Sequence, residues 1–270
     1  MLHIREMRAD EVPLLKDFAP PEWKTDLSRI FGRHFGQPYF HAIAAELAGV
    51  MVGCANGLLQ GNTGWLGNII VRPDIRRRGT GKALTEALIE FFRMQGVEFQ
   101  ILIATSMGEP VYRQLGFEVV SQYVFFERDD VSSSKDSVPG VRPLTPADED
   151  CVFALDRSVT GEVRQPFLSR FLDGASVHTG PDGAVDGFCL PGLGNGLVIA
   201  SNDAAGLALM QHKLNQGSKW PVVPDHNQVA ADFLRSNGFV ETSRAPRMSL
   251  GPDVGWQPER VYCRGSGYCG

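Results

Sequence analysis

Basic residues and glycines occur together in one segment, Arg76-Arg77-Arg78-Gly79-Thr80-Gly81-Lys82, and this combination suits the binding of a phosphate group. Arginine donates charge-assisted hydrogen bonds to phosphate oxygens, and glycine lets backbone N–H groups approach a ligand closely. An apolar, β-branched run, Ile69-Ile70-Val71, precedes the segment, and residues Ala83 to Gln95 after it have helical periodicity. A strand, a glycine turn and a helix start direct free N–H groups and the helix dipole at one anion. The sequence therefore predicts a phosphate-binding loop at the carboxyl end of a strand.

Two common phosphate motifs do not fit this segment. A nucleoside-triphosphate loop needs a glycine five residues before Gly-Lys-Ser/Thr, but that position is Arg76 and the residue after Lys82 is Ala83. A dinucleotide-binding loop needs a third glycine three residues after Gly81, where Leu84 stands. What remains is Arg-x-x-Gly-x-Gly with Val-x-Pro upstream, or a basic surface turn that binds no ligand.

The pattern made by Arg76, Gly79 and Gly81 resembles the acyl-coenzyme A pyrophosphate loop of the GNAT N-acetyltransferase superfamily. The resemblance implies an acyl-CoA-dependent N-acyltransferase, in which a primary amine attacks acetyl-CoA directly. It implies that residues Arg76 to Lys82 contact the pyrophosphate and that Ile69 to Val71 pair with the pantetheine arm like an added strand. It also places Thr105 where the family commonly has an asparagine on the coenzyme side.

Tyr112 is the residue that the resemblance identifies as general acid, because it stands four residues before Gly116-Phe117 at the end of a short helix. A free phenol has a pKa of about 10 and a departing thiolate one of about 8.5, so proton transfer to sulfur needs modest tuning. A tyrosine packed against the sheet is the structural alternative.

The sequence leaves the general base open. The amine must lose a proton before it attacks, and the family often places an acid at the start of the central strand. Here that segment is Asn62-Thr63-Gly64-Trp65-Leu66-Gly67-Asn68 and contains no acid. Glu46, Asp74 and Glu109 are candidates, although each is also typical of a solvated surface charge. A water chain and an acid from the C-terminal half remain alternatives.

Aromatic residues gather in the region that forms the acceptor-side loop of related folds: Trp23, Phe31, Phe35 and Tyr39. Such side chains line pockets for apolar amines, but most of them are expected to belong to the hydrophobic core. His34 and His41 in the same stretch show no metal-ligand or catalytic spacing, and we expect packing or surface roles for both.

The elements that position these residues follow from periodicity and turn residues. Strands are expected at 2–7, 39–47, 50–58, 65–71, 99–104 and 117–128, and helices at 10–18, 24–35, 83–95 and 109–115. This order is the one that the GNAT resemblance implies. We therefore predict an α/β fold with a mixed central sheet flanked by helices, duplicated in tandem.

A serine-rich, charged segment that ends in Pro-Gly, Asp129 to Gly140, has the composition of a linker. After it, Val141 to Asp148 echoes Ile4 to Asp10, and Asn227 to Phe239 parallels Tyr112 to Phe117. The sequence therefore predicts a GNAT-like catalytic domain at 1–130, a linker at 131–140 and a second GNAT-like domain at 141–270.

The second copy lacks the residues that would do chemistry. Between its expected central strand, Leu197 to Ser201, and the next helix the chain reads Asn202-Asp203-Ala204-Ala205, with no arginine and no Gly-x-Gly. Leu234 stands at the place that matches Tyr112 and cannot donate a proton. We expect this copy to be degenerate and the chain to have one cofactor site.

Composition excludes several classes of protein. The chain of 270 residues is 43% hydrophobic and 21% charged, with a net charge of −5, which argues against nucleic-acid binding. It has no apolar run of about 18 residues and no signal-peptide pattern, so we expect a cytoplasmic protein without a membrane segment. Its five scattered cysteines indicate neither a disulfide framework nor a metal site. Its acceptor would be a small-molecule or protein amine, and a catalytically inert acyl-CoA-sensing or protein-interaction module is the alternative function.

Overall fold

A computed structural model describes residues 1–20, 25–130, 133–134, 136–252 and 255–270. The chain forms two compact units. The first unit consists of Met1–Glu118 and Met248–Pro252, and the second of Val119–Arg247 and Asp253–Gly270. The units thus divide the chain differently from a single cut at 131–140: residues 119–130 belong to the second unit, and a short segment near residue 250 belongs to the first.

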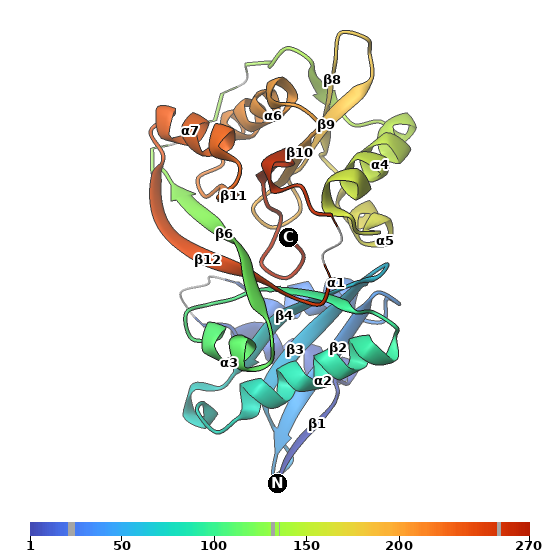
Figure 1. Cartoon of the computed structure of the whole chain (residues 1–270), viewed down its shortest axis with the longest axis vertical. Helices are drawn as coiled ribbons and strands as arrows, with labels where there is room; N and C mark the ends of the chain where they lie inside the picture. The colour runs from blue at the N-terminus through green and yellow to red at the C-terminus, as the bar shows by residue number, and fades with distance from the viewer. Residues whose placement is uncertain (21–24, 131–132, 135, 253–254) are drawn as a thin grey trace. The chain divides into compact units, whose positions relative to one another are not determined.

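The first unit is a mixed sheet with helices on both faces (Figure 1). Its strand order is β1-β2-β3-β4-β5, and the end of β12 lies beside β5. The strands β1 to β4 are antiparallel, whereas β4 and β5 are parallel. The strands are β1 (Leu2–Glu6), β2 (Phe40–Leu47), β3 (Val50–Gln60), β4 (Thr63–Val71) and β5 (Phe99–Ile103), and the helices are η1 (Ala9–Asp17), α1 (Leu27–His34), η3 (Pro73–Ile75), α2 (Thr80–Met94) and α3 (Glu109–Gln114).

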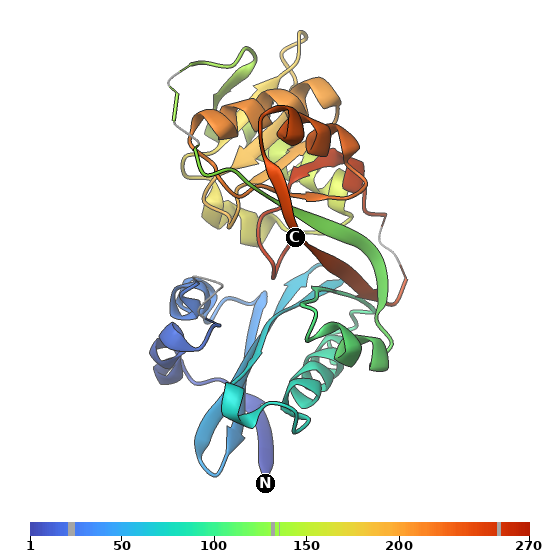
Figure 2. The same cartoon turned by 90° about the vertical axis from the view of Figure 1, so that its left-hand side faces the viewer.

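Neighbouring residues of β2 point to opposite faces of the sheet and meet different helices. His41 stacks on Phe91 of α2 with ring centroids 3.7 Å apart. Phe40 meets Phe31 of α1 edge-on, at 5.4 Å between centroids. This alternation is the two-residue period of a strand. Figure 2 shows the result: α2 covers one face of the sheet, and η1 and α1 cover the other.

The second unit repeats this plan, with short strands in its five-stranded sheet. A five-stranded sheet has the order β13-β10-β9-β8-β7, and β6 lies between β12 and β11. Its buried core gathers side chains from β6, β10, α6 and α7. The strands are β6 (Glu118–Glu127), β7 (Val141–Pro143), β8 (Ser176–Thr179), β9 (Val185–Leu190), β10 (Leu197–Ala200), β11 (Val222–Pro224), β12 (Val240–Leu250) and β13 (Val261–Cys263), and the helices are η4 (Pro146–Asp148), α4 (Glu149–Thr160), α5 (Gln165–Leu168), η5 (Ser169–Phe171), α6 (Asp203–Asn215), α7 (Gln228–Ser236) and η6 (Pro258–Arg260).

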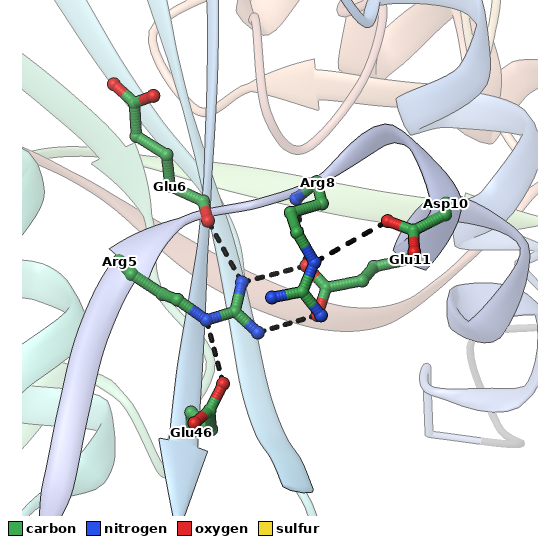
Figure 3. A network of polar contacts seen from close by, with 6 residues as sticks. All are labelled: Arg5, Glu6, Arg8, Asp10, Glu11 and Glu46. Carbon is green, nitrogen blue, oxygen red and sulfur yellow. Dashed lines mark hydrogen bonds and ion pairs between the residues drawn. The ribbon is translucent and has the colours of Figure 1, made fainter. Parts of the chain in front are cut away.

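A network of ion pairs joins the first strand of the first unit to the helix after it (Figure 3). The Arg5 guanidinium donates to both carboxylate oxygens of Glu11, at 2.8 and 2.6 Å, and also to Glu46 at 2.8 Å. Glu11 in turn accepts the backbone N–H of Arg8 at 2.8 Å. The hydrogen bond from Arg5 lowers the pKa of Glu11 to about 2.

The second unit contains the same device at the same spacing. Arg142 donates to both oxygens of Asp148 at 2.7 Å, and Asp148 accepts the backbone N–H of Thr145 at 2.9 Å. The hydrogen bond from Arg142 lowers the pKa of Asp148. An arginine on a first strand that pairs with an acid six residues later is thus common to both units. The predicted α/β fold, duplicated in tandem, is confirmed.

All five cysteines are free, and only Cys151 is exposed. No helix among the described residues is long and apolar enough to cross a membrane.

Candidate functional site

The pairing between β4 and β5 ends about a third of the way along β4. Their pairing ends at Trp65 and Ile101, although β4 continues to Val71. A β-bulge follows in β4. Asn56 and Cys54 are two residues apart on β3, but their partners on β4, Gly67 and Ile70, are three residues apart. The extra residue bends β4 and increases its twist. The edge of residues 68–71 that faces β5 therefore makes no ladder bonds to another described strand.

The first turn of α2 lacks a cap. Its N-cap residue, Gly79, has no side chain to offer, and the first helical bond runs from the N–H of Ala83 to the Gly79 carbonyl at 3.0 Å. In the described part of the chain, the N–H groups of residues 77–82 donate to no acceptor. Six donors in sequence, at the positive end of a helix dipole, form a site for a large anion.

Two left-handed residues shape the loop before this turn. Gly79 has φ of 83°, which glycine adopts freely, and Arg77 has φ of 61°. A left-handed conformation costs a residue with a side chain roughly 1–2 kcal/mol. Alternating backbone hands turn successive N–H groups into one concavity, the geometry that binds phosphate in many loops. The strain at Arg77 is therefore what an anion-binding loop requires.

The basic side chains predicted to contact the pyrophosphate have unequal surroundings. Arg76 is half-buried, and its Nε donates to the Val71 carbonyl at 3.0 Å, so this side chain fastens the loop to the end of β4. Arg77, Arg78 and Lys82 are exposed. These three keep their charge at the surface of the loop, where it attracts an anion.

Thr80 and Gly81 differ in what they offer. The Thr80 side chain is buried, so its hydroxyl is not exposed to a ligand, and its backbone N–H is the group that it can offer. A Cβ added to Gly81 would meet only Val71 Cγ2, at 3.9 Å. Nothing in the chain itself requires glycine at position 81, which is an ordinary helical position. The space beside it is consistent with close approach of a ligand.

Tyr112 lies on α3, which follows β5 directly. Its ring covers Gly108: an added Cβ there would lie 2.7 Å from the ring and 3.1 Å from the hydroxyl oxygen. The Tyr112 hydroxyl bonds to no described residue, and burial raises its pKa to about 12. The phenol is therefore neutral at all working pH values and remains a hydrogen-bond donor.

Thr105 belongs to the turn that leads into α3. Its hydroxyl accepts the N–H of Gly108 at 3.1 Å, and its carbonyl accepts the N–H groups of Gly108 and Glu109. The hydroxyl oxygen of Thr105 thus stabilises the turn. Its hydroxyl hydrogen lies at an exposed position and is available to donate to a ligand.

The three acids considered as general base are all bound to arginines. Glu46 accepts from Arg5 at 2.8 Å, as described above. Asp74 accepts from Arg72 at 2.8 Å, and this bond lowers the pKa of Asp74 and so weakens it as a base. Glu109 accepts from Arg113 at 2.8 Å on the exposed side of α3. The structure supplies no strong base among these three.

Most residues of the aromatic group are packing residues. Phe31 is fully buried and meets Phe40, and Tyr39 hydrogen bonds through its hydroxyl to Nδ1 of the buried His34 at 3.1 Å. Burial lowers the pKa of His41, whose ring stacks on α2. Phe35 is half-buried. Trp23, and Lys24 at the expected start of the second helix, lie outside the described residues.

Sequence reasoning missed a buried polar pair beside the bulge. Asn68 has φ of 49° and donates through Nδ2 to Oδ1 of Asn56, at 2.7 Å. Asn56 is fully buried, and its own Nδ2 has no acceptor among the described residues. An asparagine that follows Gly67 in an otherwise apolar strand was the available signal, because asparagine tolerates the left-handed region.

In the second unit another strand of the chain occupies the space between the two corresponding strands. By order in the fold, β10 and β11 correspond to β4 and β5. β13 pairs with β10, Val198 opposite Cys263, and the N–H of Arg264 donates to the carbonyl of Val222 on β11 at 2.8 Å. The place where β4 and β5 diverge in the first unit is therefore bridged by a strand in the second.

Helix α6, which corresponds to α2, has a first turn that is capped and covered by other residues. The Asn202 side chain caps α6 by accepting the N–H of Ala205 at 2.9 Å. A Cβ at Gly206 would lie 2.2 Å from the ring of Tyr262, so this ring covers the first turn. The Tyr262 hydroxyl donates to Asp203 at 2.6 Å. Helix α6 therefore has neither the free donors nor the space found at α2.

The same backbone hydrogen bond occurs at Tyr112 and at Leu234, the residue expected to match it in the second unit. The N–H of Phe117 donates to the Tyr112 carbonyl at 3.0 Å, and the N–H of Phe239 donates to the Leu234 carbonyl at 3.0 Å. Leu234 is fully buried and apolar.

The first unit therefore fits an acyl-coenzyme A on grounds of structure: free donors for a pyrophosphate, an unpaired strand edge for an amide-containing arm, and a neutral phenol beyond β5. The described residues contain no group of three His, Cys, Asp or Glu side chains that could hold a metal ion.

Comparisons with known proteins agree with this arrangement. Residues 5–117 match the model of the acetyltransferase (GNAT) family, and residues 152–263 match that of an acetyltransferase (GNAT) domain. No curated protein matches the chain.

Solved structures show the same fold. A putative acetyltransferase from Pyrococcus horikoshii has 20% identity and a TM-score of 0.83, covering 100% of this chain and 96% of its own. A GCN5-related N-acetyltransferase from Sphaerobacter thermophilus has 16% identity and a TM-score of 0.65, covering 95% of this chain and 98% of its own. Since the family matches together take in most of both units, the chain belongs to the GNAT acetyltransferase family, with two GNAT domains in tandem.

Proposed function

We propose that this protein transfers an acetyl group from acetyl-CoA to a primary amine, and that the first unit alone does the chemistry. The observation that carries the proposal is the run of N–H groups at residues 77–82, which bond to no acceptor in the described chain. The GNAT family uses acetyl-CoA as its acyl donor, and this loop has the donors and charge that its pyrophosphate requires.

Each part of the site has a separate task. Arg77, Arg78 and Lys82 attract and hold the pyrophosphate, together with the N–H groups of the loop. The free edge of residues 68–71 binds the arm as an additional strand and orients the acyl carbonyl. A backbone N–H near Val71 polarises that carbonyl, a contribution typically worth about 10²–10³ in rate. The bound donor supplies the activated acyl group.

Tyr112 is the proposed proton donor to the departing sulfur. Its pKa of about 12 lies above that of a free thiol, about 8.5, so full proton transfer is uphill in the unliganded site. The hydroxyl therefore acts first as a hydrogen-bond donor to the sulfur as negative charge builds there. The position over Gly108 fixes the ring for that role.

The acceptor is proposed to be a small-molecule or protein amine that enters already neutral, or that loses its proton through water. None of Glu46, Asp74 and Glu109 is available as a strong base, because each is bound to an arginine. This observation also favours the second candidate function, an acyl-CoA-sensing module without turnover.

A coupled assay separates the two functions. Purified protein is mixed with acetyl-CoA and a panel of amines, and release of free thiol is followed, which reports transfer whatever the acceptor. Turnover that depends on an amine supports the acetyltransferase. Acetyl-CoA binding without thiol release across the panel supports the sensing module, and absence of binding to any acyl-CoA contradicts both.

A further inference from the structure

A buried arginine of the second unit, Arg264, has no counterpart among the residues assigned to acetyl transfer. Arg264 follows β13 directly and is 6% exposed. Its Nε and Nη1 are fully buried and bond to no acceptor, and no described residue accepts from its Nη2. Burying a guanidinium without acceptors is costly, so such groups are rare in folded proteins.

Aromatic rings cover the faces of this guanidinium but leave its edges unbonded. Its Cζ lies 5.3 Å from the ring centroid of Tyr123 and 5.0 Å from that of Phe125. Such contacts partly offset the cost of burying a cation. They cannot satisfy the N–H groups, because these point outward in the plane of the guanidinium. The Arg264 guanidinium therefore lacks a hydrogen-bond acceptor in its own plane.

A second buried cation sits close by. Arg247 is 2% exposed, donates through Nη1 to the Tyr123 hydroxyl at 3.5 Å, and places Cζ 3.9 Å from the ring centroid of Trp256. Two guanidinium groups thus share Tyr123. Burial lowers the pKa of Arg264. The cluster is short of negative charge at Arg264.

Arg164 shows how this same unit satisfies a buried arginine that has a structural role. It is 3% exposed, pairs through Nε and Nη2 with both oxygens of Asp156, and donates through Nη1 to the Cys269 carbonyl at 2.9 Å. Every edge of that guanidinium has an acceptor from the chain. Arg264 has none, although it is buried almost as deeply.

We propose that Arg264 anchors an anion-binding site of the second unit, which takes the carboxylate of a small organic acid. A carboxylate presents two coplanar oxygens to two parallel N–H groups and so matches the free edge of the guanidinium. The rings of Tyr123 and Phe125, whose centroids lie 5.3 and 5.0 Å from Cζ of Arg264, make the surroundings of this guanidinium apolar. An aromatic acid is the class that fits both features. This site does not depend on the proposed acetyltransferase function.

Thermal unfolding of the full-length protein tests the site. Benzoate is the probe, with L-glutamate, inorganic phosphate and sodium chloride compared at equal ionic strength. A ligand that binds only the folded state raises Tm with concentration. We expect benzoate to raise the Tm of the wild type by about 2 °C or more at saturation, and to leave Arg264→Met unchanged. Equal shifts in both proteins, no shift with either carboxylate, or a shift with phosphate alone would overturn the proposal.

The variants also differ without ligand. Arg264→Met removes a buried charge that has no partner and is expected to raise Tm, whereas the matched control Arg164→Met leaves Asp156 unpaired and is expected to lower it. Arg264→Lys keeps the charge but loses the planar edge, so its benzoate shift should be clearly smaller. If Arg264→Met lowers Tm as Arg164→Met does, Arg264 has a structural role only and the proposal is wrong.

Discussion

At the scale of residues, the proposed site consists of polar groups that have no hydrogen-bond partner among the described residues. Tyr112 is buried, yet its hydroxyl bonds to nothing in the described chain, and the N–H groups of residues 77–82 are likewise unused. The two glycines differ in their surroundings: a Cβ at Gly81 would meet only Val71 Cγ2, at 3.9 Å, whereas a Cβ at Gly108 would lie 2.7 Å from the Tyr112 ring. These features allow variants that separate binding from chemistry.

Replacing Tyr112 by Phe is expected to lower kcat about 10²-fold or more, the usual contribution of a general acid, with little change in acetyl-CoA affinity. Because burial raises the pKa of Tyr112 to about 12, its ionisation should cause no loss of wild-type activity below about pH 10. Steady-state rates from pH 6 to about pH 10 test both points. A wild-type kcat that Tyr112→Phe leaves unchanged would exclude the acid role.

Gly108→Ala should displace the Tyr112 ring, since the new Cβ would lie 2.7 Å from it. Gly108 has φ of −82°, which alanine adopts without strain, so the fold should be unaffected. A small misplacement of a catalytic group costs about 10²-fold in rate. We expect kcat to fall while the Kd for acetyl-CoA, measured by calorimetry, stays the same. An unchanged kcat would show that the position of this ring does not matter.

Gly81→Ala should weaken acetyl-CoA binding about tenfold or more, because the methyl group occupies space beside the free N–H groups. Within a helix the change to alanine stabilises a protein by about 0.5–1 kcal/mol, so reduced binding could not be ascribed to unfolding. Gly32→Ala in α1 is the matched control, since its Cβ would also meet a single atom, at 3.8 Å. Equal affinities in the two variants would remove Gly81 from the site.

At the scale of elements, periodicity and turn residues predicted the strands and helices around the loop to within a few residues. Helix α2 was expected at 83–95 and spans Thr80–Met94, because the alternation of apolar residues does not show where an uncapped first turn begins. The divergence of β4 from β5 was not predictable in detail. It depends on the bulge near Asn68, which is a property of pairing between strands.

The roles of individual site residues were less visible in the sequence than the elements. Arg76 and Thr80 belong to the basic glycine segment, yet Arg76 bonds to the Val71 carbonyl and the Thr80 side chain is buried. Composition cannot tell which side chains of a loop face outward, since this follows from backbone hand at Arg77 and Gly79. Arg264 carried no sequence signal at all, because burial of a cation is decided by distant strands.

The ion pair between the first strand and the first helix gives a prediction for stability. The pKa of Glu11 falls from an ordinary 4.5 to about 2 on folding, so Glu11 stabilises the fold above pH 4.5 and loses this effect as pH falls toward 2. Glu11→Gln should lower the free energy of unfolding by about 2 kcal/mol at pH 7. The difference from wild type, measured by denaturant titration, should shrink between pH 4.5 and 2. Glu90→Gln, at an exposed position, is the control and should show no such difference.

At the scale of the whole molecule, the two units of the duplication differ in structure at corresponding places. The first keeps an open strand edge and an uncapped helix, while in the second β13 bridges β10 and β11 and Tyr262 covers the start of α6. We therefore expect calorimetry to find one acetyl-CoA per chain. Two binding events, or one binding event that persists in the variant Gly81→Asp, would indicate that the second unit binds acetyl-CoA and would contradict this division.

Acetyl-CoA is proposed to bind the free N–H groups at the start of α2 and along the end of β4. Hydrogen–deuterium exchange measures these groups directly, because an amide that bonds to nothing exchanges fast and one that bonds to a ligand exchanges slowly. We expect acetyl-CoA to slow exchange at residues 68–71 and 77–82 and to leave exchange at residues 203–206 of α6 unchanged. Unaltered exchange in the loop under saturating acetyl-CoA, or slowing confined to the second unit, would contradict it.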